Sequence, residues 1–368
     1  MNKLEIDLAI QRTIDGANFI EGKEVKELES QLSDYVGVKH CITCANGTDA
    51  MSLLMMAWEI KEGDAVFVPD FTFFSTGEIV SLCGATPVFV DVCADTFNID
   101  TTKLEQAIQA VLLEGKLVPR VVIPVDLFGL PADHDNIAKI ANKYGILVLE
   151  DAAQGFGGKI KGRNAGSFGD AATTSFFPAK PLGCYGDGGA IFTNDDDLNV
   201  LLRSLKVHGK GKDKYDNCRI GLNSRLDTLQ AGILIVKLKA FTEYELDRVN
   251  RVYEIYNQLL SGVVITPKIP IDYYSSFAQY TIQLKNKQQR DKLQQKLMIS
   301  AIPSMIYYEK PMHKQRAFSY LNLDNNLYPV SNVLSETVLS LPMHPYLSDE
   351  EIYRVCNLIT DFSAALDS

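Results

Sequence analysis

The chain has 368 residues, of which 46% are hydrophobic, and this length provides a core for one large domain and one smaller domain. Its formal net charge of −10 argues against a protein whose main function is to coat nucleic acid. No apolar run approaches the roughly 18 residues of a membrane helix, and the first residues contain no signal-peptide core. We therefore expect a cytoplasmic globular protein that has no membrane partner.

Short β-branched runs alternate with helical segments from residue 40 to about residue 195. This pattern is typical of a parallel sheet that is covered by helices. The helical segments between the runs are Asp49–Glu59, Thr102–Glu114 and one that begins after Asp133 and continues through Lys143. The predicted strands are His40–Ala45, Ala65–Pro69, Pro87–Val92, Val121–Val125, Ile146–Glu150, Ala172–Phe176 and Ala190–Thr193. We predict an α/β fold whose large domain contains a mostly parallel, seven-stranded sheet.

A change in character follows Asp227, where the sequence from Thr228 to about Leu260 predicts one long amphipathic helix. Beyond it, a short strand at Tyr280–Leu284 and helices at Arg290–Met298 and Asp349–Ala365 predict a smaller α+β domain. We place the large cofactor-binding domain at residues 1–245 and the small C-terminal domain at residues 246–368.

The seven cysteines are an odd set spread along the chain, unlike the dense frameworks of small secreted domains. Cys41 and Cys44 form one C-x-x-C motif in a strand-like run, but no second cysteine pair or histidine pair accompanies it. We predict reduced thiols and no metal site.

The strand that ends at Glu150 leads directly into Asp151. In open α/β sheets, ligands bind beyond the carboxyl ends of the strands, which is where a catalytic carboxylate is expected. An ionised carboxylate that faces a pyridine nitrogen keeps that nitrogen protonated and makes the ring an electron sink. The alternative is that Asp151 only caps the following turn.

Lys180 stands between Pro178 and Pro181, with two phenylalanines before it and a glycine-rich run after it. A lysine on such rigid, partly apolar backbone is desolvated, which lowers the pKa of its ammonium group and makes the amine a nucleophile. The alternative is an ordinary loop lysine. The nearby glycines do not indicate a nicotinamide cofactor, because Ile160 and Ile191 stand where a dinucleotide fingerprint requires its third glycine.

The segment Asn46-Gly47-Thr48-Asp49-Ala50 lies where a strand ends and a helix begins. Backbone amides at a helix start, with a hydroxyl beside them, form an anion site. Asn46 or Thr48 could equally serve as a plain helix cap.

Taken in order, these segments resemble the DegT-type nucleotide-sugar aminotransferases, a fold type I pyridoxal-phosphate family. The resemblance covers essentially the whole chain and also includes Phe71-Thr72-Phe73, Asn223–Asp227 and Leu341–Tyr346. It implies a homodimer in which Asn223 reaches the cofactor phosphate of the neighbouring subunit. The other cofactor contacts that it implies are Lys180 as the cofactor-bearing lysine, Asp151 at the pyridine nitrogen, Gln154 near the ring hydroxyl, Phe73 on the ring face, and Gly47, Thr48 and Ser175 at the phosphate.

The resemblance further implies that an amino group passes from glutamate to the keto carbon of a nucleotide sugar in cell-surface polysaccharide biosynthesis. Residues 175–190 and 223–231 are most similar to enzymes that aminate carbon 3 of UDP-2-acetamido-2-deoxy-3-ketoglucuronic acid. We expect Arg225 to bind the sugar carboxylate, because a planar guanidinium is its natural bidentate partner. Alternatively, Arg225 braces the subunit interface through Asp227 or another carboxylate. The remaining predicted substrate contacts are Tyr307, Tyr308 and His313.

Several alternatives stay open. The acceptor could be a dTDP-, UDP- or GDP-linked keto-6-deoxyhexose aminated at carbon 3 or 4, or the chain could be a non-catalytic regulatory member of the family. Relatives that dehydrate the sugar carry histidine at the position of Lys180, so the lysine argues against that activity. The basic segment Arg203–Lys212 either contacts the nucleotide diphosphate or is a solvated loop.

Overall fold

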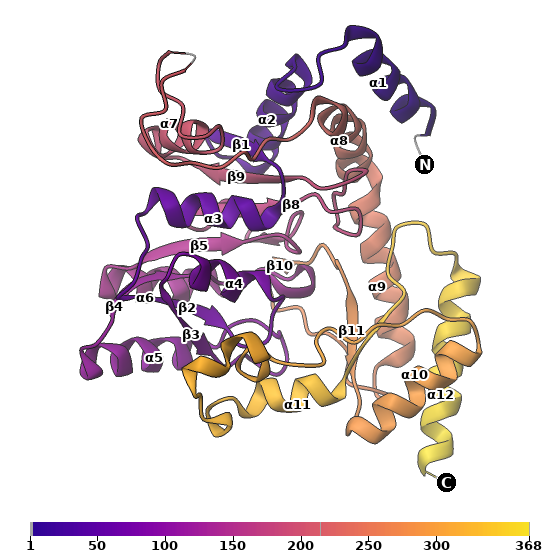
Figure 1. Ribbon diagram of the computed structural model, residues 1–368. Helices are drawn as coiled ribbons and strands as arrows, with labels where there is room; N and C mark the ends of the chain where they lie inside the picture. Colours follow the sequence, from indigo (N-terminus) through magenta and orange to yellow (C-terminus); the bar gives the residue numbers. More distant parts are fainter. Residues whose placement is uncertain (1–2, 214, 368) are drawn as a thin grey trace.

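The computed structural model describes residues 3–213 and 215–367, and its centre is a seven-stranded sheet with the order β1-β9-β8-β5-β4-β2-β3 (Figure 1). Strands β3, β2, β4, β5 and β8 are parallel, whereas β9 is antiparallel to both β8 and β1. The strands are β1 (His40–Cys44), β2 (Asp64–Pro69), β3 (Thr86–Val90), β4 (Val118–Val122), β5 (Leu147–Asp151), β8 (Ala171–Ser175) and β9 (Gly189–Thr193). The predicted mostly parallel sheet is confirmed.

Helices pack on both faces of the sheet, and the alternation of side chains along each strand explains why. In β5, Leu149 packs in the same core as α3, α4 and α7, whereas Val148 packs in the core formed with α5 and α6. The first group is α3 (Gly47–Ala57), α4 (Ser75–Leu82) and α7 (Asp196–Leu205); the second face carries α2 (Lys23–Val36), α5 (Thr101–Glu114), α6 (His134–Tyr144) and α8 (Thr228–Ala240). Because successive residues of a strand face opposite sides, Asp151 points to the α3 and α4 face and Glu150 to the α6 face.

The helix predicted for residues 228–260 is continuous but changes pitch. Helix α8 passes through a π-helical turn at Phe241–Glu245 into α9 (Leu246–Leu260). The predicted domain boundary after residue 245 falls at the end of this turn and stays a prediction.

Beyond α9, the chain builds a separate core around an antiparallel pair of strands, β11 (Tyr280–Gln283) and β12 (Val338–Leu341). Helices α10 (Lys287–Ile299), α11 (Pro329–Thr337) and α12 (Asp349–Asp367) pack near this pair (Figure 1). A small three-stranded sheet joins β10 (Tyr273–Tyr274) to β6 (Lys159–Ile160) and β7 (Arg163–Asn164) of the large α/β region. At the other end of the chain, α1 (Lys3–Gly16) packs against α8.

All seven cysteines are free in the structure. Cys41 and Cys44 lie in β1 and belong to the cores on opposite faces of the sheet, so the C-x-x-C motif brings no pair of thiols together. Among the described residues, no helix combines the length and apolar character that crossing a bilayer requires.

Candidate active site

A cavity of about 910 Å³ opens at the carboxyl ends of the parallel strands. It is bounded by the start of α3, the segment before α4, the end of β5, the turn after β8 and the segment around residues 307–315. The predicted cofactor and substrate residues that line it are Gly47, Thr48, Phe73, Asp151, Gln154, Ser175, Lys180, Tyr307 and Tyr308. The structure therefore gathers residues that are up to about 260 positions apart in the chain around one space.

Asp151 is buried at the end of β5, and both of its carboxylate oxygens accept hydrogen bonds. Its Oδ1 accepts from the backbone amide of Ala153 at 3.1 Å, and its Oδ2 accepts from the Thr76 hydroxyl at 3.2 Å. Burial raises the pKa of Asp151, whereas the Ala153 amide, the positive charge of Lys180 and the Thr76 hydroxyl lower it. The hydrogen bond from Ala153 is the local turn contact expected if Asp151 only caps the following turn. The hydrogen bond from Thr76 comes from α4, a different element, so Asp151 is more than a turn cap.

Lys180 faces the same cavity from the turn after β8, where its backbone amide donates to the Phe177 carbonyl at 2.8 Å. Burial lowers the pKa of Lys180, and the negative charge of Asp151 opposes that effect. A lysine whose ammonium form is disfavoured supplies a neutral amine more readily than a solvated one.

The start of α3 forms an anion cradle beside the end of β8. Asn46 caps the helix by accepting a hydrogen bond from the Asp49 amide at 2.7 Å. The amides of Gly47 and Thr48 belong to the first turn and have no acceptor within the helix. A Cβ atom at Gly47 would lie only 2.9 Å from the Cβ atom of Ser175, so glycine allows this close approach. Capping and anion binding are thus compatible here, and a phosphate group suits the cradle.

The remaining groups fit a flat aromatic cofactor. Gln154 accepts a hydrogen bond from the Phe128 amide at 2.9 Å and donates one to the Tyr308 hydroxyl at 3.1 Å. Phe73 is 53% exposed on the cavity wall, where its ring is accessible to a planar partner. A lysine amine, a carboxylate and a phosphate cradle around one space match the reactive groups of pyridoxal phosphate.

The DegT/DnrJ/EryC1/StrS aminotransferase family matches residues 2–360. The chain belongs to this family. A UDP-2-acetamido-2-deoxy-3-oxo-D-glucuronate aminotransferase from Pseudomonas aeruginosa is 45% identical over 362 residues, which cover 98% of this chain and 96% of that protein. The crystal structure of a DegT DnrJ EryC1 StrS aminotransferase from Brucella abortus is 47% identical, with a TM-score of 0.95 and coverage of 98% and 96%.

A more distant solved structure bears on the cofactor. The putative sugar aminotransferase Spr1654 from Streptococcus pneumoniae, in its PMP-form, is 26% identical to this chain with a TM-score of 0.92, and the match covers 100% and 98% of the two chains. The predictions of an aminotransferase and of pyridoxal 5'-phosphate as its cofactor are confirmed.

Three predicted residues lie outside the cavity lining of this aminotransferase. Asn223 is exposed and bridges to Val207, and Arg225 is half-buried. His313 is held by protein groups on both ring nitrogens, with Nδ1 at 2.7 Å from Asp70 and Nε2 at 2.9 Å from Asn325. Its predicted contact with the sugar stays a prediction, as do the roles of Asn223 and Arg225.

The basic segment of the aminotransferase divides into a structural part and an exposed part. Arg203 pairs with Glu29 at 3.0 Å, and the buried Lys206 donates to the Thr43 carbonyl at 2.9 Å, so both support β1. Arg203 and Lys206 therefore fit neither of the two predicted roles of the segment, contact with the nucleotide diphosphate or a solvated loop. Lys210 and Lys212 are exposed.

Thr76 is a site residue that the sequence did not indicate. It is fully buried in α4 and is the side-chain donor to Asp151. A threonine in the first turn of a helix is common, and only the fold brings it to a carboxylate 75 positions away.

We expect Thr76→Val to reduce turnover about tenfold, within the range for losing one hydrogen bond to a charged group. The change removes an influence that lowers the pKa of Asp151, so the carboxylate ionises less readily. Steady-state kinetics and the absorbance spectrum of the bound cofactor measure the effect. Thr76→Ser keeps the hydroxyl and is the matched control; equal losses in both variants would contradict the proposed role.

Proposed function

We propose that this aminotransferase moves an amino group from glutamate to the keto carbon of a nucleotide sugar, with carbon 3 of UDP-2-acetamido-2-deoxy-3-ketoglucuronic acid as its acceptor. The observation that carries the reaction type is the convergence of Lys180 and Asp151 on one cavity beside a phosphate cradle. The choice of acceptor rests on the likeness to the Pseudomonas aeruginosa enzyme. The product would enter cell-surface polysaccharide biosynthesis in the cytoplasm, a reducing compartment that suits seven free cysteines.

The side chains have separable roles in this proposal. Lys180 binds the cofactor covalently and moves the proton at the substrate carbon, while Asp151 holds a proton on the ring nitrogen. Gly47, Thr48 and Ser175 bind the phosphate. The cofactor supplies an electron-withdrawing ring that accepts the electron pair released when the substrate carbon loses its proton. Because burial lowers the pKa of Lys180, its amine is neutral more readily than that of a solvated lysine and can accept that proton.

The charges around the cavity support a site shared between two subunits. From this chain, the cavity lining provides three carboxylates, Asp49, Asp151 and Asp187, but only two lysines, Lys180 and Lys310. The cofactor phosphate, the diphosphate and a sugar carboxylate add negative charge that these two lysines do not balance. We infer that the partner of a homodimer supplies Asn223 and Arg225. Exposed apolar side chains near the chain start, including Leu4, Leu8 and Phe19, suit such an interface.

Arg225→Ala is expected to weaken kcat/KM for a uronic acid substrate by about 2 kcal/mol, the low end of the cost of breaking a charge pair. Within the described residues, Arg225 has no ion pair or side-chain hydrogen bond, so its guanidinium is available to a substrate carboxylate. A substrate with a neutral carbon 6 should lose much less. Arg225→Lys, which keeps the charge without the planar fork, should give an intermediate loss for the uronic acid.

Two other results would assign Arg225 a structural role instead. One is an equal loss for charged and neutral sugars. The other is dissociation of the dimer in Arg225→Ala, measured by sedimentation, which would support bracing of the interface.

The paired change Lys210→Gln and Lys212→Gln is expected to raise the KM for the nucleotide sugar about threefold for each charge removed, as for exposed ion pairs. It should also flatten the salt dependence of KM, because screening acts on the removed interactions. Lys292→Gln, an exposed lysine on α10, is the matched control. An unchanged KM and salt dependence would identify the exposed part of the segment as a solvated loop.

Turnover with glutamate against a panel of keto sugars tests the proposed function. The panel holds 3-keto and 4-keto sugars linked to UDP, dTDP and GDP, with and without a carboxylate at carbon 6. We expect the UDP-linked 3-keto uronic acid to give the highest kcat/KM. A higher kcat/KM for a keto-6-deoxyhexose would mean that this sugar, and not the uronic acid, is the acceptor. If the protein binds the cofactor but turns over none of the sugars, a regulatory role is favoured.

A further inference from the structure

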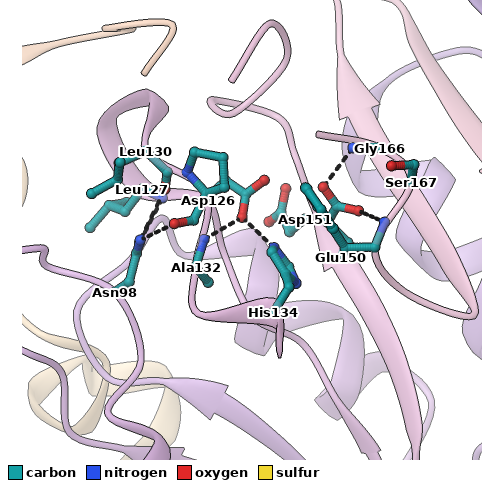
Figure 2. A network of polar contacts seen from close by, with 12 residues as sticks. Asn98, Asp126, Leu127, Leu130, Ala132, His134, Glu150, Asp151, Gly166 and Ser167 are labelled. Atoms are coloured by element: carbon teal, nitrogen blue, oxygen red, sulfur yellow. Dashed lines mark hydrogen bonds and ion pairs between the residues drawn. The ribbon is translucent and has the colours of Figure 1, made fainter. Parts of the chain in front are cut away.

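Behind Asp151, on the opposite face of the sheet, three titratable side chains form a buried cluster (Figure 2). Asp126 follows the end of β4, His134 is the first residue of α6, and Glu150 lies in β5 directly before Asp151. Asp126 and Glu150 are fully buried, and His134 is 3% exposed. One polar atom from each side chain lies within 4.8 Å of the other two. None of the three lines the cavity, and the reaction described above does not use them.

The hydrogen bonds of the cluster leave one carboxylate oxygen without a donor. Asp126 Oδ1 accepts from the Ala132 amide at 2.9 Å and from His134 Nε2 at 2.8 Å. The two oxygens of Glu150 accept from the amides of Gly166 at 2.5 Å and Phe168 at 2.8 Å. Asp126 Oδ2 is buried and has no partner among the described residues. A buried acceptor without a donor costs about 1–3 kcal/mol, so this oxygen calls for an explanation.

His134 does not compensate the two carboxylates with a positive charge. Because a carboxylate oxygen accepts, the contact of Nε2 with Asp126 Oδ1 at 2.8 Å assigns the ring proton to Nε2; Nδ1 is buried and has no partner among the described residues. A second proton on the ring would place an unpaired N–H group at Nδ1. Burial lowers the pKa of His134, which agrees with a neutral ring.

A metal ion is not favoured at this cluster either. The Asp126 and His134 atoms that would bind a metal are already at hydrogen-bond distance from each other, and both oxygens of Glu150 are occupied by amides. Among the residues that the structure describes, no lysine or arginine pairs with Asp126 or Glu150. Two neighbouring buried carboxylates without a cation cannot both ionise at low cost.

We propose that Asp126 and Glu150 share a single proton at neutral pH, and that this pair is a positioning element that limits the negative charge behind Asp151 to one unit. The shared proton supplies the donor that Asp126 Oδ2 lacks. Burial raises the pKa of Asp126 to about 8, against the lowering effects of the Ala132 amide and of the Glu150 side chain, which is close enough to share a proton with Asp126. Burial, and then the charge of Asp126, raise the pKa of Glu150 to about 8. The pair titrates as a unit rather than as two independent groups.

The backbone connects this pair to the cofactor side of the sheet. The Asp126 amide donates to the Asp151 carbonyl at 3.0 Å, and the charge of Asp151 raises the pKa of Asp126. Loss of the shared proton above about pH 8 adds a second negative charge behind Asp151. That second negative charge favours the protonated, positively charged form of the groups at the cofactor, so these groups lose their proton at a higher pH. The other titratable or charged groups near the cluster are Asp133, which caps α6, Arg163 of β7 and Tyr273 of β10. Asp135 of α6 is also near, but it is exposed and pairs with Lys161 at 2.7 Å.

Asp126→Asn and Glu150→Gln test the proposal because each fixes the charge of the pair at one unit. Asp126→Asn is the main variant, since its NH2 group stands at the position of Oδ2 and supplies the hydrogen bond that the shared proton makes in the natural chain. Glu150→Gln turns its NH2 group toward the Gly166 or the Phe168 amide and loses one of these two hydrogen bonds, so it is the supporting variant. The absorbance of the bound cofactor is followed from neutral pH to well above pH 8, without substrate, so the result does not depend on the acceptor sugar. In both variants we expect the midpoint of this absorbance change at alkaline pH to fall by about half a pH unit or more, because the second negative charge behind Asp151 can no longer form. Asp135→Asn, which removes an exposed carboxylate on α6, should leave it unchanged.

A second measurement follows the stability of the same holoenzymes. Between the unfolded-state pKa of about 4 and the folded-state pKa of about 8, the folded protein binds the extra proton, so stability falls as pH rises through this window. The urea midpoint of Asp126→Asn should fall less steeply with pH than that of the natural chain. If a variant does not fold, infrared difference spectra of the natural chain are measured instead. They should contain the absorption band of a protonated carboxyl group, which disappears above about pH 8. Unchanged cofactor midpoints, equal pH slopes or absence of the infrared band would each overturn the shared proton.

Discussion

Replacing Lys180 by alanine is expected to lower kcat by a factor of about 10⁴ or more, because one residue serves as both nucleophile and proton carrier. The cavity offers no second lysine in an equivalent place, since Lys310 is exposed at the end of the 307–310 segment. The cofactor should still bind through the phosphate cradle and Asp151. Kinetics with glutamate and the acceptor sugar measure the loss.

A second readout separates loss of chemistry from loss of binding. Borohydride treatment should fix the cofactor to the natural chain and raise its mass, but should leave the mass of Lys180→Ala unchanged. Lys239→Ala, at an exposed position of α8, is the control and should behave as the natural chain does. Turnover of Lys180→Ala within tenfold of the natural enzyme would show that another residue carries the reaction.

Asp151→Asn is expected to reduce kcat by about 10² to 10³, the usual effect of removing one preorganised electrostatic contact, while cofactor affinity changes much less. Asparagine has the same shape, and its single side-chain oxygen can accept from the Ala153 amide while its NH2 group donates to the Thr76 hydroxyl, but it has no charge to hold a proton on the ring nitrogen. Kinetics and titration of cofactor-free protein with pyridoxal phosphate give the two quantities. Equal, modest losses in both would mean that Asp151 is mainly a turn residue.

The same variant should change the titration of Lys180 in a definite direction. The charge of Asp151 raises the pKa of Lys180 against the effect of burial, so removing that charge should lower the pKa further. The rate at which cofactor-free protein takes up the cofactor depends on the neutral amine and should reach half its maximum at a lower pH in Asp151→Asn than in the natural chain.

The main-chain framework could be predicted because its signals are local. Each of the seven strands is a short run bounded by turn residues; Asp151 is the last residue of β5, and Lys180 lies in the turn that follows β8. Their placement at one sheet edge follows from parallel pairing of β5 and β8. The π-helical turn inside the long helix at 228–260 carried no such signal, because its residues are as helix-compatible as their neighbours.

Contacts between distant elements could not be predicted in the same way. Thr76 and Asp151 meet only because α4 packs over the end of β5, and nothing near Thr76 in the sequence marks it. Lys206 stands in a basic run, yet the fold buries it against the Thr43 carbonyl. For His313, the resemblance to the family predicted a contact with the sugar. In the structure, its two ring nitrogens contact Asp70 and Asn325.

The alternation of side chains in β5 also restricts how the length of the chain can vary. Asp151 serves the cavity and Glu150 the buried cluster, and one peptide unit separates them. Deleting or inserting one residue upstream within the strand would turn each carboxylate to the wrong face of the sheet, while the pairing with β4 and β8 could still form. Such a change would yield a folded but inactive protein, so insertions and deletions are tolerable in the turn at Gly145 before this strand. They are not tolerable within Leu147–Asp151 or in Ala152–Gln154, which continues into the cavity lining.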